Sequence, residues 1–296
     1  MQVNTNNYSY QIAIIALFIA AFGWAAAGVF IKLLPMLQAY EVVVLRFLFA
    51  FIFLSIFLGL KSNFKAIIRD LKYSSTWLYG FIMLSCYYMG TVSFQLASVA
   101  ETTLLMSMAP LFVILYKLLA KQNISLKEKR GFLIAIVGII ILFGANFSNS
   151  DYTISRIFGN CLALGVAFLF AVYAILHSQK KEHSPSSISV TYAMLLVALI
   201  PSFYFLGYSA SINQNMLFDN LLILIGLGIF STAIPTIAIT MASKNLPPVT
   251  TSSVLLLETI FGAFLAYLFL NEIFSWYFLI SVCVILVGLL LMILKK

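Results

Sequence analysis

Ten apolar segments dominate the amino-acid sequence, and each is long enough to cross a lipid bilayer as a helix. A membrane-spanning helix needs about 20 apolar residues, whereas membrane strands are about 9–11 residues long and alternate in polarity. The segments are residues 10–32, 38–60, 76–97, 99–120, 129–147, 156–178, 187–208, 219–243, 248–270 and 274–294. Only 9% of the residues are charged and 63% are hydrophobic, too few polar residues to cover a water-soluble fold. The sequence therefore predicts an all-α membrane protein with ten transmembrane helices.

The basic residues indicate how these helices are oriented. When the loops are assigned alternately to the two sides of the membrane, 14 Lys and Arg fall on one side. The other side receives only Lys32 and Arg156, and Arg46 lies inside the second segment. Because cytoplasmic loops carry the excess of Lys and Arg, we predict a bacterial inner-membrane protein with both termini in the cytoplasm. The net charge of +8 then reflects topology and not a nucleic-acid partner.

The second half of the sequence echoes the first. Thr102 and Thr250 each begin a Thr-Thr pair that opens an apolar segment, and an echo at about half the chain length indicates an internal repeat. We place the two copies at residues 1–147 and 156–296, with five segments each. Because five is odd, the second copy must be inverted in the bilayer. Inverted repeats that enclose a site near the midplane are typical of secondary transporters.

Short motifs occur along both copies, three in the first and three others in the second. They are Phe22-Gly23-Trp24 followed by Lys32, Leu45-Arg46-Phe47, Ala109-Pro110, Leu257-Glu258, Asn271-Glu272 and Val287-Gly288. With these motifs the chain resembles the EamA-type branch of the drug/metabolite transporter superfamily over nearly its whole length. It departs from that pattern at Thr259, where a Pro usually follows the Glu, and at Gln122-Asn123, where the first copy lacks the loop acid.

The resemblance implies a function and a set of helices for the site. It implies export or exchange of small metabolites, often amino acids, through a cavity between the halves. It places spans 1, 3, 4, 6, 8 and 9 around that cavity and spans 5 and 10 at the periphery.

Two charged residues lie well inside apolar segments. Glu258 is about ten residues into its segment, hence about 15 Å deep, where an unpaired carboxylate costs at least about 2.5–3.5 kcal/mol. It is our candidate for proton coupling or for binding a substrate amine; a structural carboxyl bonded to neighbouring hydroxyls is the alternative. Arg46 has a planar fork suited to a carboxylate or phosphate, and an anchoring role for its side chain is the alternative reading.

Aromatic and polar side chains at helical spacing are the candidate cavity lining. Tyr88 and Gln95 are seven apart and Thr236 and Thr240 four apart, so each pair shares a helix face. Such a cavity combines aromatic walls with a few polar groups. The full set is Trp24, Tyr87, Tyr88, Gln95, Met106, Tyr173, Thr236 and Thr240. Interfacial anchoring and core packing are the ordinary alternatives for such residues.

Two prolines lie within predicted cavity helices, Pro110 in the fourth and Pro235 in the eighth. A proline removes an intrahelical hydrogen bond and bends the helix, so both are candidate hinges or kinks.

The predicted function is a secondary transporter of small metabolites working by alternating access, driven by a substrate gradient, by exchange or by a proton at Glu258. No phosphate-binding glycine loop, metal-ligand cluster or catalytic motif occurs, so we expect neither a cofactor, a bound metal nor an enzyme. The expected partners are a small-molecule substrate and the lipid bilayer, and both a monomer and a dimer fit the sequence. Two alternatives remain open: an exchanger of anionic nucleotide- or phosphate-linked metabolites, and a receptor or scaffold that transports nothing.

Overall fold

The structure, a computed structural model, describes residues 5–60, 64–146, 153–178, 185–208, 218–245 and 254–293. Every regular element in these ranges is a helix, as predicted. In chain order they are α1 (Thr5–Lys32), α2 (Ala39–Leu60), α3 (Phe64–Asp70), α4 (Ser74–Leu96), α5 (Val99–Met106), α6 (Ala109–Leu119), α7 (Leu126–Asn146), α8 (Ile154–Ser178), α9 (Ser187–Tyr208), α11 (Leu221–Ile225), the π-helix η1 (Gly226–Ala233), α12 (Ile234–Asn245), α14 (Val254–Leu270) and α15 (Trp276–Ile293).

The helices are apolar enough for a bilayer. Among the described residues, five stretches are both long and apolar enough to cross a membrane: Tyr10–Lys32, Ala39–Gly59, Val99–Leu119, Ile154–Leu176 and Leu221–Ile239. Shorter apolar helical stretches cover Ser187–Leu199, Leu256–Leu270 and Trp276–Met292. The chain is an integral membrane protein, and ten spans remain a prediction.

Two predicted spans are interrupted, and both interruptions lie close to the prolines. The fourth span is divided between α5 and α6, and Pro110 lies in the first turn of α6, where its missing N–H has no intrahelical partner to lose. The eighth span contains η1, and Pro235 is the second residue of α12, directly after it. The short helix α3, between the second and third spans, was not predicted.

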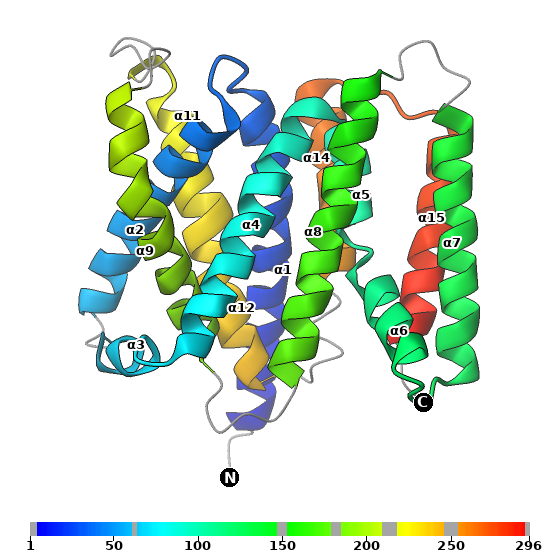
Figure 1. The fold of residues 1–296 in the computed structure, drawn as a ribbon, viewed down its shortest axis with the longest axis horizontal. Helices are drawn as coiled ribbons and strands as arrows, with labels where there is room; N and C mark the ends of the chain where they lie inside the picture. The colour runs from blue at the N-terminus through cyan, green and yellow to red at the C-terminus, as the bar shows by residue number, and fades with distance from the viewer. Residues whose placement is uncertain are drawn as a thin grey trace.

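Helices of the first half pack mainly on helices of the second half. Within the described part of the chain, α1 packs on α12 and α14, α4 on α8 and α9, α2 on η1, and α7 on α15. Figure 1 shows α7 and α15 together at one side of the bundle, with α2 and α9 at the other. The start of α1 and the end of α15 both lie at the lower end in this view.

Glycines bring α7 and α15 unusually close together. A Cβ atom at Gly131 would lie 2.5 Å from the carbonyl oxygen of Gly288, and one at Gly288 would lie 2.7 Å from the amide nitrogen of Ala135. Real Cβ atoms do not approach backbone so closely, so only glycine permits this contact. Small residues of this kind allow helices to associate tightly in membranes.

Candidate functional site

A cavity of about 230 Å³ lies where the two halves meet. Its walls come from α1, α2, α4, α5 and α8 together with α9, α12 and α14. Aromatic and sulfur-containing side chains make up much of the lining, among them Phe94, Phe170, Met83 and Met194. Among the described lining residues the charged ones are Glu258 and Arg46, so this part of the cavity combines apolar walls with a carboxylate and a guanidinium.

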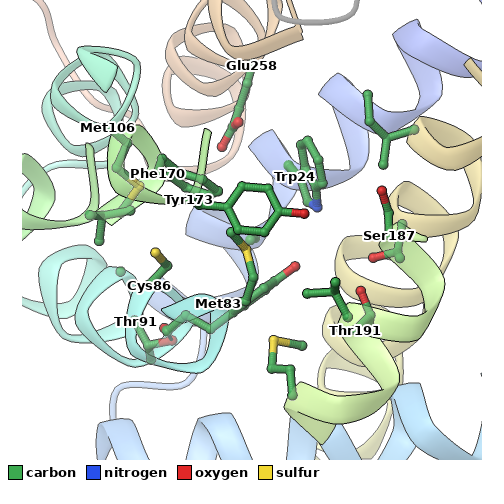
Figure 2. A pocket seen from close by; sticks show the side chains of 18 of the residues that line it. Trp24, Met83, Cys86, Thr91, Met106, Phe170, Tyr173, Ser187, Thr191 and Glu258 are labelled. Atoms are coloured by element: carbon green, nitrogen blue, oxygen red, sulfur yellow. Dashed lines mark hydrogen bonds between the residues drawn. The ribbon is translucent and has the colours of Figure 1, made fainter. Parts of the chain in front are cut away.

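Glu258 reaches the cavity from the second turn of α14, and Figure 2 shows its carboxylate pointing into the open space. No hydrogen bond or ion pair within 4.0 Å joins this carboxylate to any described side chain. The next residue, Thr259, is buried and turns its hydroxyl to the carbonyl oxygen of Thr103 at 3.3 Å. Trp24 also lines the cavity, and its buried indole N–H makes no hydrogen bond of ordinary geometry to a described residue. The cavity therefore presents polar groups that are available to a ligand.

Arg46 is held in place by the irregular eighth span. Its Nε donates to the hydroxyl of Thr232 at 2.5 Å, and its Nη2 donates to the carbonyl oxygen of Ser231 at 2.7 Å. In an α-helix the N–H of residue 235 would donate to the carbonyl oxygen of Ser231, four residues earlier. Pro235 has no N–H, so this carbonyl lacks its helical donor. The guanidinium carbon also lies 4.6 Å from the centre of the Tyr87 ring, within cation–π range. Arg46 thus supplies a hydrogen bond that Pro235 cannot make.

Seven candidate residues from the sequence line this cavity: Trp24, Arg46, Tyr87, Met106, Tyr173, Thr236 and Glu258. Two others lie elsewhere. Tyr88 is 46% exposed on another face of α4, and the amide of Gln95 donates to the carbonyl oxygen of Leu37 at 2.9 Å near the end of α4. The side chain of Thr240 lies outside the described residues. Pro235 is the second residue after η1, whose Thr232 and Ser231 bind Arg46, and Pro110 lies in α6, away from the cavity lining.

Several lining residues were not predicted. On α4, Met83, Gly90, Thr91 and Phe94 lie three, four or seven residues from Tyr87, and this helical spacing could have identified them; Cys86, next to Tyr87, also lines the cavity. On α9 the lining residues are Ser187, Val190, Thr191 and Met194. They also repeat at helical spacing, but the spans that the resemblance places around the cavity do not include this one, so these residues were not among the candidates.

Four charged residues interact at neighbouring helix ends: Lys32 ends α1, Glu101 is in the first turn of α5, Arg156 is in the first turn of α8, and Glu272 follows α14. Figure 1 shows these helix ends at the top of the bundle. Arg156 of α8 binds Glu101 of α5 through two hydrogen bonds of 2.8 and 3.0 Å. The amide of Asn160 donates to the same carboxylate at 3.1 Å. Glu101 is only 2% exposed. We call these four residues the charged cluster; its ion pair joins the first half of the chain to the second.

Glu272 makes a second connection between the halves. From the loop after α14 it accepts hydrogen bonds from the backbone N–H groups of Val99 at 2.8 Å and Ala100 at 3.3 Å, which are free because they begin α5. Burial raises the pKa of the Glu272 carboxyl above its ordinary value, although these two hydrogen bonds and the charge of Lys32 oppose the change. Asn271 before it has φ 53°, a left-handed conformation that Asn tolerates better than most residues.

The cavity approaches the end of the bundle opposite the charged cluster. Ser187, the first residue of α9, is part of its lining, and α9 starts at the lower end in Figure 1. From α5 only Met106, the last residue, reaches the cavity. None of the four residues of the charged cluster lines the cavity. Within the described ranges, no three His, Cys, Asp or Glu side chains are grouped to hold a metal ion.

Comparison with known proteins agrees with this architecture. The model of the EamA-like transporter family matches the chain twice, over residues 11–144 and 157–294. A protein of Archaeoglobus fulgidus described as an uncharacterized transporter is 24% identical over 245 residues, covering 81% of this chain and 84% of that protein. A solved crystal structure shares the fold with a TM-score of 0.67 and 17% identity, covering 94% of this chain and 95% of the other. The chain belongs to the EamA-like transporter family.

Proposed function

We propose that this protein is a secondary transporter that exports amino acids or related amphipathic metabolites by alternating access. The observation that carries the proposal is the cavity between the halves, where Glu258 and Arg46 face a space with otherwise mainly apolar walls. The volume, about 230 Å³, suits a small metabolite better than a large one, since drug-sized ligands occupy pockets of about 300–1,000 Å³.

The two charges suit a substrate that carries both signs. The Glu258 carboxylate would bind an ammonium group. Arg46 uses two of its five N–H donors on Thr232 and Ser231, so three remain for a substrate carboxylate. Aromatic and thioether side chains would pack against the apolar part of such a substrate. An anionic phosphate-linked substrate fits this cavity less well, because the Glu258 carboxylate would repel it.

We further propose that the protein consists of ten spans in two inverted repeats, residues 1–147 and 156–296. Three observations support this division. The family model matches once in each part. The packing of α1 on α12 and α14 has a counterpart in the packing of α8 on α4 and on α5 with α6. The corresponding helices α6 and α14 are each followed by a residue with positive φ, Lys121 at 52° and Asn271 at 53°.

The position of the cavity supports alternating access. If the side rich in Lys and Arg is cytoplasmic, the charged cluster closes the cavity on the outer side and the substrate reaches it from the cytoplasm. Outward opening would break the ion pair between Glu101 and Arg156 and withdraw Glu272 from α5. Reclosing of the same contacts would complete the cycle.

A proteoliposome experiment tests this function. Uptake of a labelled amino-acid mixture is measured with and without an imposed pH gradient, for the wild type, for Glu258→Gln and for Asp219→Asn, which removes an exposed carboxylate. One pH unit corresponds to about 1.4 kcal/mol of driving force for each proton. We expect gradient-driven uptake that is lost in Glu258→Gln and kept in Asp219→Asn. Gradient-driven uptake in the Glu258→Gln protein would contradict proton coupling at this residue, and absence of any amino-acid flux would contradict the substrate class.

A further inference from the structure

A groove of about 410 Å³ lies between α7 and α15, at the end of the bundle opposite the charged cluster. Two basic side chains, Lys127 and Arg130, line it from the first turns of α7. Leu133 and Ile134, one turn further along α7, and Leu291 near the end of α15 provide its apolar wall. Residues three and four apart share a helix face, so the groove changes from basic to aliphatic along a single face of α7.

The basic part of the groove is not neutralised by nearby acids. Glu128 is the acid adjacent in sequence, but its carboxylate binds the ammonium of Lys117 at 2.7 Å and accepts the backbone N–H of Ser125 at 2.8 Å. Its charge is thus engaged by the preceding loop and helix. Lys127 and Arg130 remain exposed, and no carboxylate of the described residues lines the groove. The groove is therefore a site of net positive charge.

The two helices that form the groove pack closely against one another. Gly131 begins the close approach to Gly288 described above, and Met292 packs over Gly131, where a Cβ atom would lie 2.8 Å from the Met292 Cγ. Gly131 lies between Arg130 and Leu133 in sequence, so the tight contact lies directly beside the groove. A binding site built on such a contact loses little freedom when it is filled.

We propose that this groove binds one phospholipid with an anionic headgroup, whose phosphate contacts Lys127 and Arg130 and whose acyl chain lies along Leu133, Ile134 and Leu291. Basic pockets between helices at the cytoplasmic surface bind anionic lipid headgroups, and the apolar wall continues in the direction of the bilayer core. A free phosphate ion would use only the basic part. A zwitterionic lipid would leave the positive charge of the groove uncompensated.

Native mass spectrometry of the purified protein in a non-ionic detergent tests the site. Phosphatidylglycerol and phosphatidylcholine with identical acyl chains are titrated separately, and the bound lipid is counted. The test variant is Lys127→Gln/Arg130→Gln. The matched control is Lys65→Gln/Lys72→Gln, which removes one exposed cation in the first turn of α3 and another just after its end. We assume that each of the two basic residues contributes the binding free energy typical of a Lys or Arg near an anionic membrane surface. The test variant should then bind the first phosphatidylglycerol about 30-fold more weakly than the wild type.

The expected pattern is preference for phosphatidylglycerol in the wild type and in the control, and loss of that preference in the test variant. Equal phosphatidylglycerol binding by the test variant would overturn the proposal. So would displacement of the lipid by inorganic phosphate at comparable concentration, because the groove would then be a site for the free anion. Leu133→Trp gives an independent check, since its larger ring fills the apolar wall and should reduce lipid binding while both cations remain.

Discussion

The ion pair between Arg156 and Glu101 offers the sharpest test of the proposed closure. In Arg156→Gln the Glu101 carboxylate, 2% exposed, keeps the Asn160 amide but loses two charge-assisted hydrogen bonds. A hydrogen bond to a charged group contributes about 1.5–3 kcal/mol net when buried. The Arg156 side chain is 30% exposed, and solvent screening weakens such pairs. We therefore assign about 2 kcal/mol to the pair as a whole.

That free energy translates into a change of population. Minor conformations of such two-state proteins typically have populations of about 0.1–10%, and about 2 kcal/mol shifts an equilibrium about 30-fold. An outward-open form at about 1% in the wild type would thus rise to about a quarter of the molecules in Arg156→Gln. Labelling of a residue in the cavity from the outer side should then accelerate by more than an order of magnitude.

The assay uses Thr91→Cys, a cavity position on α4, in a protein whose three native cysteines are replaced by serine. A membrane-impermeant maleimide is added to vesicles of known orientation, and the labelling rate is compared with and without Arg156→Gln. Lys117→Gln is the control, because it breaks the ion pair with Glu128 at 2.7 Å within the first half of the chain. Equal labelling rates in Arg156→Gln and the control would refute the closure.

Three further predictions concern stability. Arg46→Lys should lower the melting temperature in detergent and reduce the free energy of unfolding by about 1–3 kcal/mol, because one ammonium cannot reproduce the two hydrogen bonds of the guanidinium to η1. An unchanged melting temperature would contradict the anchoring role. Gly131→Ala should destabilise the protein by about 1–3 kcal/mol through overpacking. In Gly144→Ala, in the same helix, the added Cβ would have no described atom within 4 Å, so this variant should be neutral or up to about 1 kcal/mol more stable. Similar thermal shifts in the two variants would argue against the close contact. The pKa of Glu272 is raised in the folded protein, so the folded state binds the proton more tightly than the unfolded state. This carboxyl therefore lowers the free energy of unfolding as pH rises from about 4.3 through the raised pKa. The melting temperature of the wild type minus that of Glu272→Gln should fall over that pH window, and a flat or rising difference would contradict this direction.

The all-helical membrane fold could be predicted from the sequence. The apolar segments are long and carry little charge, and in a bilayer such segments satisfy their backbone hydrogen bonds as helices. The cavity lining was harder to predict, as two neighbouring tyrosines show. Tyr87 lines the cavity and Tyr88 lies on another, exposed face of α4. A helix that is apolar on all sides gives no periodic signal that separates a cavity face from a lipid face. Only rare residues such as Glu258 and Trp24 indicate the cavity face.

The interactions of Arg46 could not have been predicted from spacing. Its partners Thr232 and Ser231 lie more than 180 residues away in the chain, and one of them is available because of a proline in a different helix. The charged cluster is similar in this respect. Lys32 and Arg156 were recognised only as charges at the outer side, while the pairing of Arg156 with Glu101 depends on how α5 packs against α8.

We propose above that this protein carries a small amphipathic substrate through a cavity that opens alternately to the two sides. Counterflow tests this claim most directly. Proteoliposomes are loaded with an unlabelled amino-acid mixture and diluted into a trace of the labelled mixture without any ion gradient. A carrier predicts transient accumulation of label above the external concentration, reduced when Arg46→Gln and Glu258→Gln are combined. Simple equilibration without an overshoot, or no entry of label at all, would contradict the account.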